Sequence, residues 1–168
     1  METLKKFALA AMGIMLVAGC GEKQETYTPV RENEVTSDKP SVREIREKLN
    51  NKGYKTFDYI DEASGDTILM QQYFIVFLKS GKVKSANKAE LDSLQALHLA
   101  HLSRMYEEGY ADISGPFGDD GEIRGITIYN TPTLAIADSL AHLDPLVKSG
   151  RLEIEVHPWW AAKGFPLR

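Results

Sequence analysis

Residues 72–79, which read Gln-Tyr-Phe-Ile-Val-Phe-Leu-Lys, decide the fold of this 168-residue chain. An unbroken run of aromatic and branched apolar residues between polar ends predicts a buried strand. Successive side chains of a strand point to opposite faces, so the run presents Tyr73, Ile75 and Phe77 on one face and Phe74, Val76 and Leu78 on the other. Other apolar residues must therefore pack against both faces of the sheet at this strand.

The segments after this strand alternate between helical and strand patterns. They predict a long amphipathic helix (88–108), two strands (110–114 and 123–130), a second helix and a last strand (151–157). The second helix is expected to start at Thr131 or Thr133 and to run to about Leu143. The residues expected to end these elements include Gly109, Gly115-Pro116, Asp144-Pro145 and Pro158. The order strand–helix–strand–strand–helix–strand is that of two split βαβ units. It predicts an α+β, ferredoxin-like βαββαβ fold with an antiparallel sheet and both helices on one face.

Such a fold leaves the second face of its sheet uncovered. The simplest cover is a second copy of the chain, packed sheet against sheet as a dimeric α+β barrel. We therefore expect a homodimer.

The amino terminus has the three parts of an export signal, in order. Lys5 and Lys6 precede the apolar residues 7–17, which are too few for a membrane-spanning helix of about 20 residues. The signal ends in Leu16-Val17-Ala18-Gly19-Cys20, which resembles the lipobox of bacterial lipoproteins. We expect cleavage before Cys20 and acylation of its thiol. A plain secretory signal, or a transmembrane helix with an incidental cysteine, is the alternative.

Cys20 is the single cysteine of the chain, which excludes an intramolecular disulfide. A lone exported thiol is a liability in an oxidising compartment, and acylation removes it. Two or more acyl chains, such as palmitate, hold a protein stably on a membrane. The sequence therefore predicts a membrane partner, with the chain exported from the cytoplasm and anchored through Cys20 in the bacterial cell envelope.

Composition divides the chain into segments of different character. The segments are a signal peptide (1–19), a polar, flexible tether (20–39), an N-terminal extension (40–71), the main domain (72–160) and a tail (161–168). The extension contains a short predicted helix that begins with a capping box of Ser41 and Glu44.

The charge balance excludes one class of partner. The net charge is −4, and the sequence contains no basic cluster and no aromatic residues interleaved with arginine. Nucleic-acid binding requires such a basic footprint, so we predict no nucleic-acid partner.

Two polar residues stand out against the helical pattern. His98 falls in the apolar stripe of the long helix, between Leu94 and Leu102, where a buried imidazole requires a hydrogen-bond partner. Asp144 ends the second helix, where the helix dipole disfavours an acid. If both helices share a sheet face, Asp144 can reach His98, and such a pair is the usual core of a general base. The alternatives are a neutral core histidine and an aspartate that only terminates a helix.

The remaining candidates have weaker patterns. The four histidines complete no recognisable zinc pattern, although His98 and His101 have a spacing that can hold one metal, and we predict no metal site. Arg124 fits either an anionic substrate or a surface ion pair with a neighbouring acid. The glycines of residues 115–121 permit close backbone approach to a ligand, or only form a hairpin turn.

Taken together, these residues resemble the YCII-related domain family, and its exported members in particular. The resemblance spans about residues 72–160. It rests on His98-Leu99-Ala100-His101-Leu102, Gly109, Ser114-Gly115-Pro116-Phe117-Gly118-Asp119-Asp120-Gly121, Arg124-Gly125, the run Asp144-Pro145 to Arg151-Leu152, and His157-Pro158-Trp159. It implies a ferredoxin-like fold that pairs as a dimeric α+β barrel.

The resemblance also implies a site. The family has a His–Asp pair in a pocket between helix and sheet, which His98 and Asp144 match. Ser114 and Gly115-Pro116 match the segment that lines this pocket. One enzymatic branch removes chloride from a chlorinated hydroxyquinol. Because the lipid anchor and the N-terminal extension set this chain apart from the small cytoplasmic members, we transfer no substrate.

Three functions stay open on the sequence alone. The first is a cofactor-free enzyme that uses His98 as general base or acid, oriented by Asp144, on a small molecule. The candidates for substrate binding are Ser114, Gly115, Pro116 and Arg124. The alternatives are a non-catalytic module that binds a small molecule and a structural module of the cell envelope. An exported protein lacks ready access to ATP and nicotinamide pools, which favours chemistry without a cofactor.

Overall fold

The computed structural model describes residues 39–84 and 87–167. The helices of these residues are α1 (Val42–Asn51), α2 (Lys88–Glu107), α3 (Leu134–Ala141) and α4 (Pro145–Lys148). The strands are β1 (Thr56–Ile60), β2 (Thr67–Ser80), β3 (Ala111–Pro116), β4 (Ile123–Tyr129) and β5 (Leu152–Ala162). The predicted signal peptide, Cys20 and most of the predicted tether lie outside the described residues.

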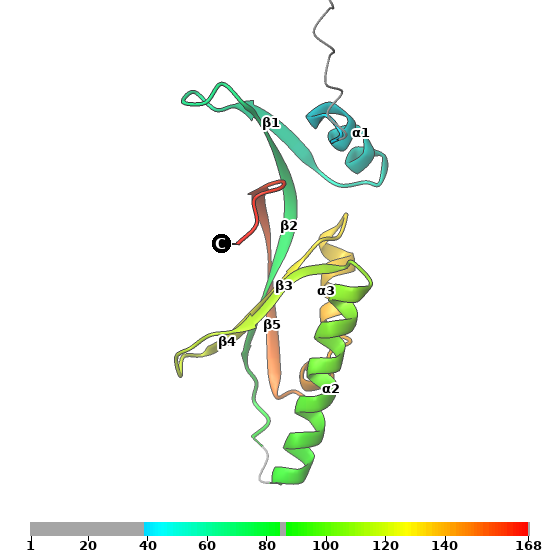
Figure 1. Ribbon diagram of the computed structural model, residues 1–168. Coiled ribbons are helices and arrows are strands. Elements are labelled where there is room, and N and C mark those ends of the chain that lie inside the picture. Colours follow the sequence, from blue (N-terminus) through cyan, green and yellow to red (C-terminus); the bar gives the residue numbers. More distant parts are fainter. Residues whose placement is uncertain (1–38, 85–86, 168) are drawn as a thin grey trace, which may run out of the picture. The chain divides into compact units, whose positions relative to one another are not determined.

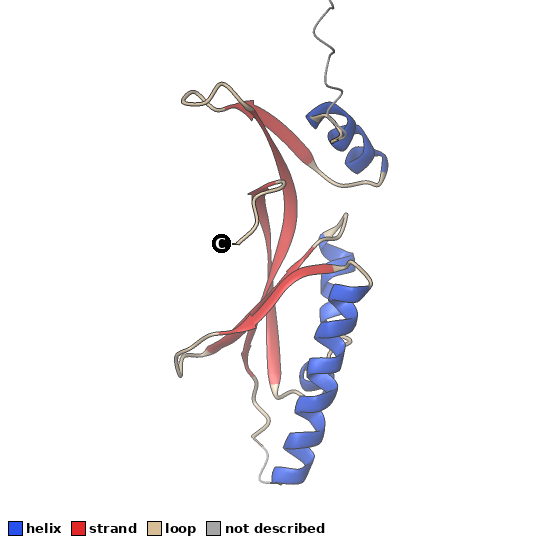
Figure 2. Ribbon diagram, viewed as in Figure 1, coloured by secondary structure: helices blue, strands red, loops and turns tan. Residues whose placement is uncertain are grey.

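The strands form one antiparallel sheet in which β2 is central. β5 and β4 pair with opposite edges of β2, and β3 pairs with β4, which gives the order β5-β2-β4-β3. β1 pairs with the first part of β2, from Thr56↔Gln71 to Ile60↔Thr67. The helices α2 and α3 lie on one side of this sheet (Figure 1, Figure 2). The prediction of an α+β, ferredoxin-like fold with an antiparallel sheet and both helices on one face is confirmed.

The core lies between the sheet and the helices. Phe74, Val76 and Leu78 of β2 are buried there, together with Met105 of α2, Tyr129 of β4 and Ala137 of α3. The odd-numbered side chains of β2 point to the other face, where Ile75 and Phe77 are only half-buried. The two apolar rows predicted for this strand therefore have different surroundings, since one is packed under helices and the other is partly open.

Several strands run past the residues predicted to bound them. β2 begins at Thr67 because its first residues pair with β1. β3 continues through Pro116 and β5 through Pro158. Both strands lie at an edge of the sheet, where the missing N–H of proline costs no ladder hydrogen bond. The predicted end of the last strand at Pro158 is therefore wrong, whereas β3 does end at Pro116.

The N-terminal extension is joined to the same sheet. The Ser41 amide donates to the Glu44 carboxylate at 2.7 Å and the Glu44 amide donates to the Ser41 hydroxyl at 3.3 Å, so the predicted capping box is confirmed. The helix that it begins, α1, contacts β1 and β2, and an ion pair between Arg46 and Asp58 ties α1 to β1.

The buried residues of α2 are His98, His101 and Met105, whereas Leu94 and Leu102 of the predicted stripe are only half-buried. His101 is only 5% exposed because α4 packs against α2. The Arg104 guanidinium lies 3.3 Å from His101 Nδ1. A guanidinium can only donate, so Nδ1 accepts and the ring proton is on Nε2. That Nε2 is buried and has no hydrogen-bond partner among the described residues.

This environment predicts a pH dependence of stability. Burial lowers the pKa of the His101 imidazole below its ordinary value of 6.5, against the opposing pull of the Asp144 carboxylate. The unfolded chain therefore binds a proton more readily than the folded chain, and the free energy of unfolding falls as the pH drops below about 6.5. We predict that His101→Gln reduces this fall, by at most about 1.4 kcal/mol per pH unit.

Urea denaturation near neutral pH and near pH ~5 measures this difference. His142→Gln, at an exposed position that follows α3, is the control and is expected to behave like the wild type. The same pH dependence in the wild type and in His101→Gln would contradict the prediction.

Candidate functional site

A short hydrogen bond joins the two residues that stand out in the sequence. His98 Nδ1 lies 2.6 Å from Asp144 Oδ2. Both side chains are buried, with 9% of His98 and 2% of Asp144 exposed. His98 lies in the middle of α2, and Asp144 lies in the turn that follows α3. The fold therefore brings together two residues that are 46 positions apart in the chain.

Asp144 begins a helix as well as following one. α3 ends at Ala141, and α4 starts at Pro145 with Asp144 as its N-cap. Asp144 Oδ1 accepts a hydrogen bond from the Leu146 amide at 2.9 Å. The dipole at a helix N-terminus favours a carboxylate, so the interpretation that this acid opposes a helix dipole is wrong. Both carboxylate oxygens of Asp144 are thus engaged, one by a backbone amide and one by His98.

The hydrogen bond to Asp144 selects the tautomer of His98. A carboxylate only accepts hydrogen bonds, so Nδ1 carries the proton in the neutral ring and Nε2 keeps its lone pair. Such a ring can take a proton at Nε2, and the carboxylate then stabilises the imidazolium that forms. The pair therefore has the arrangement of a general base with an orienting acid.

His98 lines a cavity of about 390 Å³ between α2 and the sheet. The same cavity is lined by Ser114, Gly115, Pro116 and Arg124, the residues expected from the sequence to bind substrate. Most of the remaining wall is apolar and includes the side chains of Leu78, Leu99, Leu102, Leu146 and Leu152. A largely apolar cavity with a few convergent polar groups is typical of a small-molecule site. Asp144 lies behind His98 and does not line the cavity.

The paired strands β3 and β4 form one wall of this cavity. The Ser114 hydroxyl donates to the Thr127 hydroxyl at 3.1 Å, across a register pair of the two strands. A Cβ at Gly125 would lie 2.7 Å from the Gly115 carbonyl oxygen, which is closer than side chains tolerate. Glycine at position 125 therefore permits the close approach of the strands that holds Gly115 and Pro116 in the wall.

Arg124 provides a positive charge at the cavity. Its guanidinium donates to the Gly121 carbonyl at 3.1 Å and takes part in no ion pair among the described residues. The neighbouring acids have other contacts, since Glu122 lies 3.4 Å from the Lys79 ammonium and Asp119 accepts from the Gly121 amide. The alternative that Arg124 forms a surface ion pair is not seen, and its charge is available to a ligand.

One lining residue was missed in the sequence. Gln95 lies three positions before His98 on α2 and lines the same cavity. Residues three apart share a helix face, so the signal was present in the spacing. The described residues contain no group of three or more His, Cys, Asp or Glu side chains placed to hold a metal ion.

Comparisons with known proteins concern the part of the chain that builds this site. The model of the YCII-related domain matches residues 73–160, just over half of the chain. Among solved structures, 5-chloro-2-hydroxyhydroquinone dehydrochlorinase of Burkholderia phenoliruptrix, in complex with 2,5-dihydroxybenzoquinone, is similar at 19% identity. The TM-score is 0.41, over 52% of this chain and 92% of that one. A search of curated proteins gives no match. On its family match, the chain belongs to the YCII-related domain family.

Proposed function

We propose that this protein is an enzyme in which His98 transfers a proton to or from a small molecule and Asp144 orients the imidazole. The observation that carries the proposal is the 2.6 Å hydrogen bond between His98 Nδ1 and Asp144 Oδ2. It supports the role because it leaves Nε2 of His98 for a ligand in the cavity that His98 lines. Proton transfer between side chain and substrate requires no cofactor, so the proposed reaction is cofactor-free.

A purely structural role for the pair explains less. A buried ion pair or hydrogen-bonded pair that only fixes helix packing has no need of an adjoining cavity. Here the cavity beside His98 also has the Arg124 charge, the Ser114 hydroxyl and the Gln95 amide on its wall. A non-catalytic binding module would use the same cavity, and it differs from an enzyme only in what happens to the bound molecule.

Deuterium exchange tests the pair directly. In D₂O, the full-length protein is incubated with a panel of small carboxylic acids and phenols that have weakly acidic C–H bonds, and deuterium uptake is followed by mass spectrometry. We predict that His98→Gln lowers catalysed exchange or turnover by about 10²–10⁴-fold, because the proton acceptor is lost. Asp144→Asn is expected to lower it as well, because an asparagine still caps α4 but no longer selects the tautomer or stabilises the imidazolium.

His142→Gln is the control, because His142 hydrogen-bonds the Asp138 carbonyl of α3 and does not line the cavity. Undiminished exchange in His98→Gln would sink the catalytic proposal. Stoichiometric binding of a panel member with no exchange in the wild type would favour the binding module.

We also propose that the protein is a homodimer in which the sheets of two copies face each other. Members of the family are typically dimeric. The half-buried Ile75, Phe77, Ile113 and Ile126 support the proposal, because they form a continuous apolar area on the sheet face opposite α2 and α3. Exposed apolar area of this kind marks an interaction surface.

Sedimentation of the full-length protein measures the state of association. We predict a dimer, and we predict that Phe77→Lys shifts it to monomer because a charge would be buried between the sheets. Leu134→Lys, on the exposed surface of α3, is the control and is expected to remain dimeric. A monomeric wild type would exclude the proposed pairing.

We further propose that the chain is exported and anchored to the membrane of the cell envelope through acylated Cys20. The lipobox-like sequence before Cys20 supports this, since it follows a charged and then an apolar segment. Among the described residues, no helix is long and apolar enough to cross a membrane.

Labelling of bacterial cells with radioactive palmitate measures the anchor. We predict that the wild type takes up label and sediments with membranes, whereas Cys20→Ser takes up none, because the thiol that receives the lipid is gone. Label on Cys20→Ser equal to that on the wild type would show that another residue is modified and would refute the assignment.

A further inference from the structure

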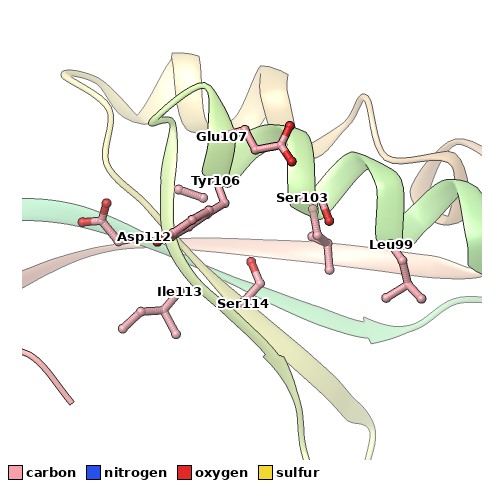
Figure 3. A pocket seen from close by; sticks show the side chains of 9 residues that line it. Leu99, Ser103, Tyr106, Glu107, Asp112, Ile113 and Ser114 are labelled. Carbon is pink, nitrogen blue, oxygen red and sulfur yellow. The ribbon is translucent and has the colours of Figure 1, made fainter. Parts of the chain in front are cut away.

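The cavity at His98 continues into a second hollow. This hollow has a volume of about 740 Å³ and shares Leu99, Leu102 and Ser114 with the first. Figure 3 shows Leu99, Ser103 and Tyr106 projecting from α2, with Ser114 on β3 pointing toward α2 and Ile113 pointing away from it. The two hollows therefore adjoin along α2 and β3, with Arg124 lining one and Tyr106 lining the other, and we name them together the α2–β3 groove.

Charge is distributed unevenly along the α2–β3 groove. Arg124 lines the end beside His98, where no acidic side chain lines the wall. Glu107 and Asp112 line the other end. The Asp112 carboxylate accepts a hydrogen bond from the Asn130 amide, and the Glu107 carboxylate points away from Ser114 in Figure 3. An anionic group is therefore attracted to the Arg124 end and repelled from the other.

Between Leu99 and Tyr106, the α2–β3 groove has large apolar side chains that are open to solvent. Leu99 is 53% exposed and Tyr106 is 68% exposed, although both are large and both lie along the wall. A ligand that covers this surface removes apolar area from water, which strengthens binding by about fourfold for each methylene that it buries. The groove thus has a place for a charged head and a separate place for an apolar tail.

We propose that the α2–β3 groove binds an elongated amphipathic acid, with its carboxylate at Arg124 beside His98 and its unbranched apolar tail along Leu99 toward Tyr106. This inference rests on the proposed function and names the class of substrate for the same site. In only one orientation does the carboxylate of such a molecule lie at Arg124 and away from Glu107 and Asp112.

Titration with a series of straight-chain acids tests the tail. The full-length chain with Cys20→Ser has no thiol to acylate and is therefore studied without detergent. It is titrated calorimetrically with butanoate, hexanoate and octanoate. We expect the affinity to rise by about two- to fourfold per added methylene. Leu99→Ser is expected to flatten this rise, with a larger loss of affinity for octanoate than for butanoate.

Leu97→Ser is the matched control for the tail. Leu97 lies on the same helix and is 52% exposed, but it lines a different surface, with Arg104 and Lys148. Its variant is expected to keep the full dependence on chain length. Equal affinities for butanoate and octanoate in the wild type, or the same slope in Leu99→Ser as in the wild type, would overturn the placement of the tail.

The head is tested with a neutral analogue. Octanamide has the same tail as octanoate without its charge, and we expect it to bind at least about tenfold more weakly to the wild type. Arg124→Gln should weaken octanoate to the level of octanamide and leave octanamide unchanged. Equal binding of the two compounds by the wild type would exclude recognition of an anion at Arg124.

These measurements are independent of catalysis. They can be repeated in the His98→Gln background, where binding of octanoate is expected to persist because the carboxylate is held by Arg124. A flat dependence on chain length with a large effect of His98→Gln on exchange would reject the amphipathic acid and leave the proton-transfer role standing. An affinity that rises with chain length, together with no effect of His98→Gln on exchange, would reject the proton transfer and keep the amphipathic acid as the ligand class.

Discussion

The buried carboxylate of Asp144 is the constraint on which the site depends. A carboxylate that is 2% exposed is costly unless both oxygens are hydrogen-bonded. One oxygen is satisfied by the Leu146 amide at the start of α4 and the other by His98 on α2. The acid therefore fixes the position of the imidazole relative to the turn between α3 and α4, and it fixes the tautomer at the same time.

The strand β2 explains why the site and the proposed subunit contact do not compete. Phe74, Val76 and Leu78 pack under the helices, where the cavity lies, and Ile75 and Phe77 belong to the half-open face. The sheet separates these two faces. A second copy of the chain can therefore cover the apolar face without closing the entrance beside Arg124 and Leu99. The α2–β3 groove also lies on the helix side, since Leu99 and Leu102 come from α2.

The sequence predicted the fold well because the fold depends on local periodicity. The alternation of residues 73–78 and the order of helix and strand patterns suffice for the ferredoxin-like arrangement. Details that depend on tertiary neighbours were wrong. Proline ends a central strand but is tolerated in an edge strand. No local sequence pattern shows that β5 is an edge strand, so its continuation through Pro158 could not be predicted. The role of Asp144 as an N-cap was missed because a new helix of a single turn begins directly after it. Likewise, the burial of His101 depends on this same α4, so the helical pattern of α2 alone could not predict it.

The cost of the His98–Asp144 pair argues for chemistry over packing. A buried polar pair contributes little net stability compared with apolar side chains of similar volume, and it destabilises the fold strongly when one partner is removed. An apolar pair at these two positions would hold α2 against α4 at least as well. What an apolar pair cannot provide is a nitrogen lone pair on a residue that lines a cavity, with a carboxylate that compensates its charge. The arrangement of the pair beside the Arg124 charge is therefore better explained by proton transfer on a bound acid than by the stability of the fold.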